Sequence, residues 1–158
     1  MNENRAIQTI ELDGFSFDYA HFIEGLGKCG NLHGHSSIVK VELTGELIKY
    51  GVVVDFVEAK KIIREVLEGF DHRLIVSKNN ISIESEDTRY VIVFNDSDSI
   101  PSRIVLNKER VVVLVDGESS IENISMHIGA LLWGTLKHNY PNLFGIKVKC
   151  SEGVNNYA

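Results

Sequence analysis

The sequence predicts an α+β domain built on an antiparallel sheet, and three observations carry that prediction. Apolar and polar residues alternate near both ends of the chain, which is the period of a half-buried strand. Two segments with apolar residues at helical spacing lie between them. The chain has 158 residues, enough to bury one core, so we expect a single domain over residues 1–158.

Two strands are expected before the first helix. Aromatic residues alternate with small or polar ones over residues 15–21, and the alternation resumes over 33–43 after a glycine-rich loop at 25–30. Residues i and i+2 of a strand share a face. If the second strand reaches back to His33, then His33 and His35 both lie on its core-facing side.

Each expected helix begins with a capping box, in which a cap residue is followed three positions later by glutamate. Apolar residues at helical spacing continue from Phe56 to Phe70 in the first helix and from Ile124 to Leu136 in the second. The two pairs of cap and glutamate are Asp55 with Glu58 and Ser119 with Glu122.

The stretch between the helices is rich in expected strands, at residues 90–94, 103–106 and 111–115. The chain closes with a further alternating segment over 146–150. The order of elements is therefore strand, strand, helix, a strand-rich stretch, helix and strand, which is an α+β pattern.

Composition narrows the classes of partner. The formal net charge is −6, which argues against non-specific binding to nucleic acid or membranes because phosphate groups need a cationic face. No apolar run approaches the roughly 20 residues of a membrane span, and the N-terminus lacks the apolar region of a signal peptide. Cys29 and Cys150 are too few to form a disulfide scaffold. We therefore expect a cytoplasmic protein.

Three histidines can meet in this arrangement of strands. His33 and His35 would project side by side from one strand, and His21 lies in phase with the core-facing side of the preceding strand. Three neutral imidazoles that leave an open position form the catalytic arrangement of zinc. The alternative is that each is a hydrogen-bonded histidine of the core.

Cys29, Asp71 and His72 are further candidates for chemistry. Cys29 stands four residues before His33 in the glycine-rich loop, where it can be a fourth zinc ligand, an acid/base thiolate near the metal, or a small buried residue. A carboxylate beside an imidazole is a common way to orient a general base. As an isolated dipeptide, however, Asp71-His72 is more often a pair of solvated turn residues.

Blocks of residues in this order resemble the 6-pyruvoyl-tetrahydropterin synthase / 6-carboxytetrahydropterin synthase family. Each block alone is modest, but the ordered set is specific and covers nearly the whole chain except the middle stretch. The blocks are the aromatic strand ending in His21, Cys29-x3-His33-Gly34-His35, Gly51-Val52-Val53-Val54-Asp55-Phe56, Asp71-His72-Arg73, Ser119-Ser120-Ile121-Glu122-Asn123-Ile124 and Ser151-Glu152-Gly153.

The resemblance implies two sets of reactive residues. A cysteine, an aspartate and a histidine would transfer protons to and from the pterin and its side chain. Three histidines would bind the zinc ion. The proton-transfer residues are Cys29, Asp71 and His72, and the zinc ligands are His21, His33 and His35.

The resemblance also implies contacts to the pterin. Glu152 matches a glutamate that anchors the ring, and one carboxylate can accept both hydrogen bonds from an amino group beside a ring N–H. Ser119 and Ser120 stand where relatives often carry hydroxyl residues beside the pterin. Glu122 either contacts the pterin or caps the helix. For the triphosphate, Lys28 is a nearby candidate, although a solvated lysine is the more common reading.

The implied architecture is the tunnelling fold, an antiparallel four-stranded sheet with two helices packed on one face. Trimers of such subunits join their sheets into a barrel and stack into a homohexamer, with active sites between subunits. The stretch from about residue 76 to 110 is longer than in compact members, and we expect it to form an extra hairpin.

The implied substrate is 7,8-dihydroneopterin triphosphate. The three residues between Cys29 and His33 resemble the 6-carboxytetrahydropterin synthases of deazaguanine (queuosine or archaeosine) biosynthesis, which release triphosphate and acetaldehyde. The alternatives are the pyruvoyl-forming reaction, a different zinc hydrolase, and a non-catalytic protein that binds pterin or only assembles. The sequence lacks an HExxH-like motif that would place a base beside the ligands, which argues against the hydrolase. The presence of both Cys29 and Asp71-His72 argues against a protein that only binds pterin.

Overall fold

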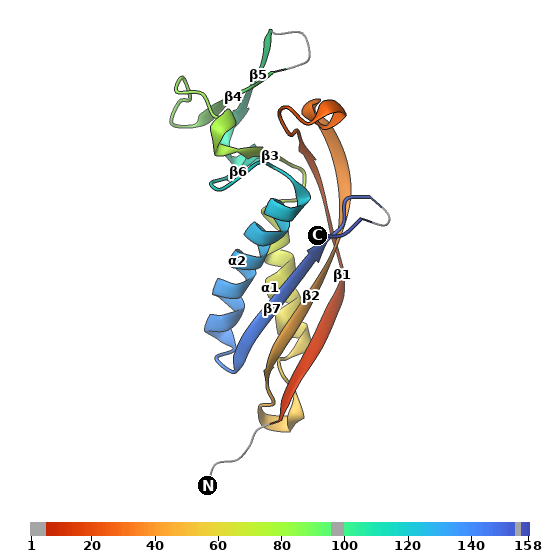
Figure 1. Ribbon diagram of the computed structural model, residues 1–158. Coiled ribbons are helices and arrows are strands. Elements are labelled where there is room, and N and C mark those ends of the chain that lie inside the picture. Colours follow the sequence, from red (N-terminus) through yellow and green to blue (C-terminus); the bar gives the residue numbers. More distant parts are fainter. Residues whose placement is uncertain (1–5, 96–99, 154–155) are drawn as a thin grey trace.

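The computed structural model describes residues 6–95, 100–153 and 156–158. A five-stranded sheet has the strand order β6-β3-β1-β2-β7, and two helices pack on one face of it (Figure 1). A separate two-stranded sheet, β4-β5, lies beyond one end. The elements are β1 Ile7–His21, β2 His33–Glu46, α1 Phe56–Glu68, β3 Arg73–Ser77, β4 Arg89–Asn95, β5 Pro101–Asn107, β6 Val111–Leu114, α2 Ile121–Asn139 and β7 Leu143–Cys150.

The long antiparallel pair of β1 and β2 forms the frame of the molecule. Alternate residues of both strands are buried against α1 and α2 in the main core, as the alternating sequence pattern predicts. The register sets His21 opposite His33 and Tyr19 opposite His35. The second strand therefore begins at His33, which places both of its histidines in the sheet.

The expected four-stranded antiparallel sheet is wrong in the number and direction of its strands. β3 pairs parallel with the last residues of β1, through Tyr19 with Arg73 and Ala20 with Leu74, and β6 pairs parallel with β3. The parallel pairing of β3 arises because α1 returns the chain toward the end of β1 (Figure 1). The run Leu74–Ser77 then enters the sheet with all its side chains buried, which is typical of a parallel strand.

The helices form where the apolar spacing predicts them, but one cap differs. Asp55 caps α1, because its carboxylate accepts hydrogen bonds from the backbone N–H groups of Val57 and Glu58. In α2 the cap is Ser120, whose hydroxyl accepts from the N–H of Asn123. The expected Ser119–Glu122 capping box is therefore wrong by one residue.

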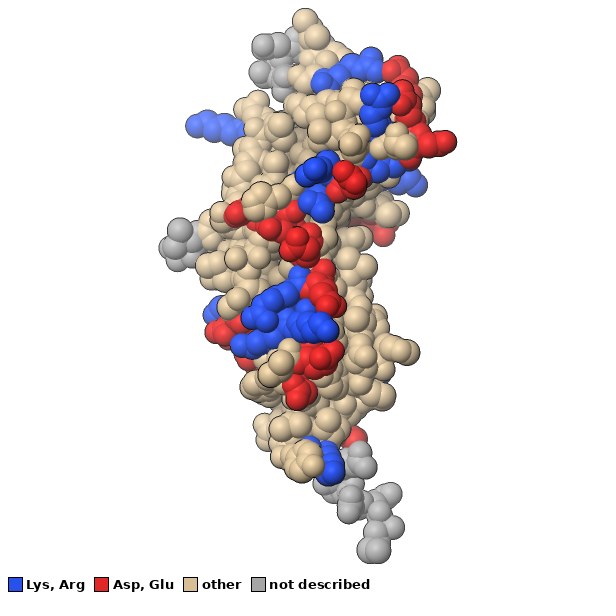
Figure 2. All heavy atoms as spheres, turned by 180° about the vertical axis from the view of Figure 1, so that it is seen from behind, with Lys and Arg blue, Asp and Glu red and all other residues tan. Residues whose placement is uncertain are grey.

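No helix in the described ranges is both long and apolar enough to cross a bilayer. On the face drawn in Figure 2, Lys and Arg side chains are interspersed with Asp and Glu rather than gathered into one basic surface.

The expected extra hairpin forms from β4 and β5. The carboxylate of Glu24, in the loop after β1, ties the hairpin to that loop: it accepts hydrogen bonds from the backbone and side-chain N–H groups of Asn95 and from Nδ2 of Asn80. A second core lies beneath the hairpin, where the rings of Phe22 and Phe94 stack with centroids 4.3 Å apart. The hairpin is thus fastened to the end of β1, where His21 lies.

Replacing Glu24 with alanine should lower the free energy of unfolding by about 1–2 kcal/mol, because three N–H donors lose a charged acceptor. Urea unfolding measures this change. The matched control is Glu109→Ala, since the Glu109 carboxylate makes a surface ion pair with Arg110 at 3.7 Å. That control should cost less than about 0.5 kcal/mol, and equal losses in the two variants would contradict the anchoring role of Glu24.

Candidate metal centre and active site

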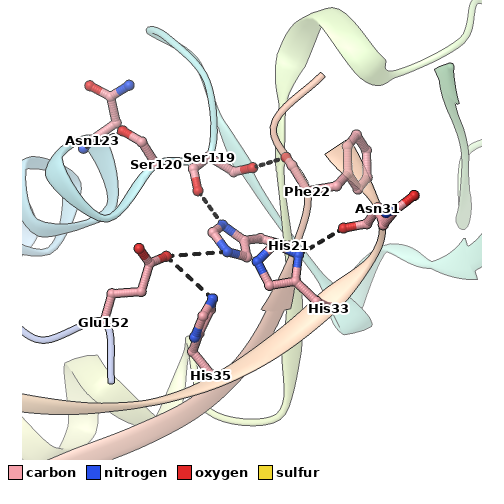
Figure 3. A network of polar contacts seen from close by, with 9 residues as sticks. All are labelled: His21, Phe22, Asn31, His33, His35, Ser119, Ser120, Asn123 and Glu152. Carbon is pink, nitrogen blue, oxygen red and sulfur yellow. Dashed lines mark hydrogen bonds and ion pairs between the residues drawn. The ribbon is translucent and has the colours of Figure 1, made fainter. Parts of the chain in front are cut away.

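Three histidine side chains converge at the paired ends of β1 and β2 (Figure 3). One ring nitrogen from each of His21, His33 and His35 lies within 4.8 Å of the others. The ring centroids are between 4.6 and 5.1 Å apart. His21 is fully buried, whereas His33 and His35 are half-buried. The sheet register therefore brings together the three residues expected to hold zinc.

Backbone carbonyls orient two of these rings. Nδ1 of His21 lies 2.5 Å from the carbonyl oxygen of Ser119, and Nδ1 of His33 lies 2.7 Å from that of Asn31. A carbonyl only accepts, so each Nδ1 carries the proton and each Nε2 keeps a lone pair in the neutral ring. Desolvation by burial lowers the pKa of His21, which favours that neutral ring. Metal-binding histidines are commonly held by such contacts.

The carboxylate of Glu152 points toward the histidine cluster. Oε1 of Glu152 lies 3.4 Å from Nε2 of His21 and 3.4 Å from Nε2 of His35 (Figure 3). Both nitrogens are buried, and neither has a hydrogen-bond partner in the described part of the chain. A carboxylate oxygen and an imidazole lone pair repel each other unless a positive charge lies between them. The three imidazoles fit a divalent metal ion such as zinc, and the Glu152 carboxylate lies beside them rather than within the group of ligand atoms.

Two buried hydroxyl groups lie on the same face as the histidines. Tyr19 and Ser37 hydroxyls lack a hydrogen-bond partner among the described residues, and the Tyr19 ring contacts those of His21 and His35 at centroid distances of 5.1 and 5.8 Å. Burial, with the Glu152 carboxylate nearby, raises the pKa of Tyr19. Sequence reasoning missed both residues, because each fits the alternating strand pattern as an ordinary core position.

Asp71 and His72 form a pair immediately before β3. Nδ1 of His72 lies 2.8 Å from Oδ2 of Asp71, and Oδ1 of Asp71 accepts a hydrogen bond of 2.8 Å from the backbone N–H of Asp18. This N–H bond is the main cause that lowers the pKa of Asp71, and the His72 contact adds to it. The backbone of His72 is left-handed, with φ +55°. Such a conformation is strained for a residue with a side chain and is enriched at functional sites.

The Asp71–His72 pair and the histidine cluster lie on opposite faces of β1. The Asp18 carboxylate groups with Asp71 and His72, separately from the three histidines. Side chains alternate along a strand, and Tyr19 is buried on the same face as His21, so Asp18 points the other way. Within one chain, the two groups therefore do not meet.

Cys29 lies in the short 3-10 helix Gly27–Gly30, which connects β1 to β2, and it is partly buried. Its carbonyl accepts a hydrogen bond of 2.7 Å from the N–H of Ile23, which closes the loop. Among the described residues, Cys29 does not belong to the group of ligand atoms around the three histidines. The geometry of the single chain therefore does not make it a fourth metal ligand.

Ser119 and Ser120 lie where α2 begins, on the side of the histidine cluster (Figure 3). The hydroxyl of Ser119 is buried and donates to the carbonyl of Phe22 at 2.6 Å, so this residue supports the site through its own carbonyl at His21. Glu122 is exposed in the first turn of the helix. Its carboxylate is therefore accessible to a ligand.

Comparison with known proteins identifies the family of this chain. The model of the 6-pyruvoyl tetrahydropterin synthase family matches residues 9–158. The chain belongs to this family. It is accordingly a tetrahydropterin synthase, an enzyme of the lyase type, and the resemblance read from its ordered blocks is confirmed.

Individual relatives agree with this placement. A Methanocaldococcus jannaschii protein provisionally named 6-carboxy-5,6,7,8-tetrahydropterin synthase is 32% identical over 146 residues, covering 89% of this chain and 86% of its own. The 6-carboxy-5,6,7,8-tetrahydropterin synthase of Haemophilus influenzae is 44% identical over 72 residues, 42% of this chain and 51% of its own. The crystal structure of 6-pyruvoyl tetrahydropterin synthase from Plasmodium vivax matches with a TM-score of 0.80 at 26% identity, covering 97% of this chain and 96% of its own.

The strain at His72 has a measurable consequence. His72→Gly should raise the free energy of unfolding by about 1 kcal/mol, because glycine adopts positive φ without a steric cost. The matched control is Tyr50→Gly, at an exposed residue with φ +73°, which should stabilise the chain by a similar amount. Urea unfolding of both variants measures this. Destabilisation by His72→Gly alone would mean that the side chain holds the fold rather than being kept for chemistry.

Proposed function

We propose that this chain catalyses the zinc-dependent conversion of 7,8-dihydroneopterin triphosphate to 6-carboxy-5,6,7,8-tetrahydropterin, with release of triphosphate and acetaldehyde. This reaction would serve deazaguanine (queuosine or archaeosine) biosynthesis. The observation that carries the proposal is the convergence of His21, His33 and His35 in a chain whose relatives bear the name of that synthase.

The three histidines would hold the zinc ion. The carbonyls of Ser119 and Asn31 fix two of the rings with their Nε2 lone pairs free, and the burial of His21 keeps that ring neutral. A bound zinc ion polarises the hydroxyl and keto oxygens of a substrate side chain and so acidifies the neighbouring C–H bonds.

Recognition of the pterin ring is assigned to Glu152, with Ser119, Ser120 and Glu122 around it. A carboxylate can accept paired hydrogen bonds from the amino group and the adjacent ring N–H of a pterin. Two features support this assignment: Glu152 lies beside the histidine cluster, and Glu122 is exposed at the start of α2. Ser119 acts indirectly, because its hydroxyl is bonded to Phe22.

Proton transfer is assigned to His72 and Cys29. Asp71 faces Nδ1 of His72 and favours the proton on that atom, which leaves Nε2 to take or give a proton. The Asp18 N–H keeps the Asp71 carboxylate ionised by lowering its pKa. Cys29, in the loop that leads to His33, would serve as the second proton-transfer group.

The complete site would form between subunits. The support is the position of the Asp71–His72 pair, which lies on the face of β1 opposite to His21 and so needs a second copy of the chain to reach a metal centre. We propose a homo-oligomer, a hexamer made of two trimers, as the assembly. The cleft of about 600 Å³ that Lys28 lines with Asn31 and Asn95, beside the Cys29 loop, is our candidate for the triphosphate.

A second candidate reaction is the formation of 6-pyruvoyl-tetrahydropterin from the same substrate. The observation in its favour is the similarity to the Plasmodium vivax 6-pyruvoyl tetrahydropterin synthase over nearly the whole of both chains. Both reactions release triphosphate, but only the carboxy-forming one releases acetaldehyde.

Incubation of the zinc-loaded protein with 7,8-dihydroneopterin triphosphate tests the proposal. We expect acetaldehyde and 6-carboxy-5,6,7,8-tetrahydropterin in equal amounts, identified by mass spectrometry. A pyruvoyl product without acetaldehyde would decide for the second candidate, and binding without turnover would mean that the chain is a pterin-binding protein.

Replacement of Cys29 with alanine should reduce turnover by about 100-fold or more, since general acid–base groups contribute about 10²–10⁴-fold. The matched control is Cys150→Ala, because burial raises the pKa of that thiol to about 11 and so keeps it inert. Both variants should retain zinc. Unimpaired turnover in Cys29→Ala would contradict the assignment.

A further inference from the structure

Tyr19 brings a hydroxyl group to the edge of the histidine cluster. It shares a face of β1 with His21 and lies directly opposite His35 on β2. Its ring contacts both histidine rings, at centroid distances of 5.1 and 5.8 Å. Only 4% of Tyr19 is exposed, yet its hydroxyl has no hydrogen-bond partner within the described ranges. A buried hydroxyl without a partner destabilises the folded chain, so packing alone does not explain a tyrosine here.

The Glu152 carboxylate lies beside the same two histidines. Its Oε1 is 3.4 Å from Nε2 of His21 and 3.4 Å from Nε2 of His35 (Figure 3). Burial raises the pKa of Tyr19, and the negative charges of Glu152 and Glu122 add to this effect, as expected for carboxylates near the hydroxyl. These are the two carboxylates to which the proposed function assigns the pterin ring. The Tyr19 hydroxyl therefore belongs to the same part of the site as the pterin contacts.

A pterin ring held by a carboxylate keeps one acceptor that needs a further partner. On this edge of the ring an amino group, a ring N–H and a carbonyl follow one another, and the carboxylate accepts hydrogen bonds from the first two. The carbonyl requires a donor, which a carboxylate cannot supply. The Ser119 hydroxyl already donates to the carbonyl of Phe22 at 2.6 Å. The Tyr19 hydroxyl makes no bond to any residue that the structure describes, and a phenol keeps its proton at neutral pH, so it can donate.

We propose that Tyr19 is a pterin-binding residue, whose hydroxyl donates a hydrogen bond to the ring carbonyl next to the N–H that Glu152 binds. This inference rests on the pterin contact of the proposed function. The hydroxyl is covered in the free chain, so binding requires a neighbouring side chain to move. The Glu152 side chain is about one-third exposed (32%), which gives it room to turn from the histidines onto the ring. Pterin binding thus satisfies a hydroxyl that folding leaves unpaired.

The proposal predicts opposite effects on stability and on affinity. Tyr19→Phe keeps the aromatic ring and removes only the hydroxyl. In the free chain this removes an unpaired buried group, so the urea midpoint should stay the same or rise. In the complex it leaves the ring carbonyl without its donor, so pterin should bind about 5- to 50-fold more weakly. A tyrosine that only fills the core would leave the affinity unchanged.

Fluorescence titration of the zinc-loaded protein with unsubstituted pterin measures this affinity without turnover. Unsubstituted pterin carries the ring carbonyl but no side chain, so it reports on contacts to the ring alone. The matched control is Tyr140→Phe, which removes a phenol hydroxyl at the other end of α2, where it lies 3.5 Å from the carbonyl of Asp55. That control should leave the pterin dissociation constant within about twofold. Glu152→Gln is the positive control for ring recognition.

Zinc binding, measured by competition with a chromophoric chelator, distinguishes a contact to the ring from a role at the metal. The zinc dissociation constant of Tyr19→Phe should stay within about twofold of that of the unaltered chain, because the hydroxyl is not assigned to the metal. Weaker pterin binding with unchanged zinc affinity and a urea midpoint that does not fall would support the proposal. A loss of zinc affinity as large as the loss of pterin affinity would contradict it.

The outcomes separate this inference from the function that supports it. If Glu152→Gln weakens pterin binding and Tyr19→Phe does not, Tyr19 makes no contact to the ring and the inference is overturned, while the carboxylate contact stands. If the unaltered chain does not bind unsubstituted pterin, ring recognition itself fails and the inference fails with it.

Discussion

The pairing register of β1 and β2 is the constraint on which the rest of this structure depends. It sets His21 opposite His33 and places His35 on the same face, so three imidazoles meet at the end of a two-stranded ribbon. A slip of one residue would turn every side chain of one strand to the other face and disperse the cluster. The deep core beneath the ribbon, built from its alternate residues and the two helices, holds that register.

Backbone carbonyls determine which ring nitrogen carries the proton in two of the three histidines. Ser119, at the start of α2, fixes the proton of His21 on Nδ1, and its hydroxyl ties the same segment to Phe22 of the loop after β1. The Nε2 lone pair of His21 faces the Glu152 carboxylate, and a nearby cation would relieve the repulsion between them. The start of α2 and the loop after β1 therefore help to set the protonation of His21. The β4-β5 hairpin is attached to the same loop through Glu24.

Local patterns predicted much of this fold, and long-range pairing accounts for what they missed. The alternation in β1 and β2 located both strands and the shared face of His33 and His35, because strand periodicity is a local property. The same reasoning could not find the parallel pairing of β3, which depends on where α1 returns the chain. It also could not distinguish Tyr19 from an apolar core residue, nor foresee that Asp71 and His72 lie across β1 from the histidines, because both facts arise only from tertiary packing.

Metal analysis of the purified protein tests most directly whether the histidine cluster holds a metal ion. The protein should contain about one zinc ion per chain by plasma mass spectrometry, and its thermal stability should fall on treatment with a chelator, because ligand binding stabilises the folded state. A protein that holds no zinc after exposure to the ion, or whose stability is the same with and without it, would contradict the account.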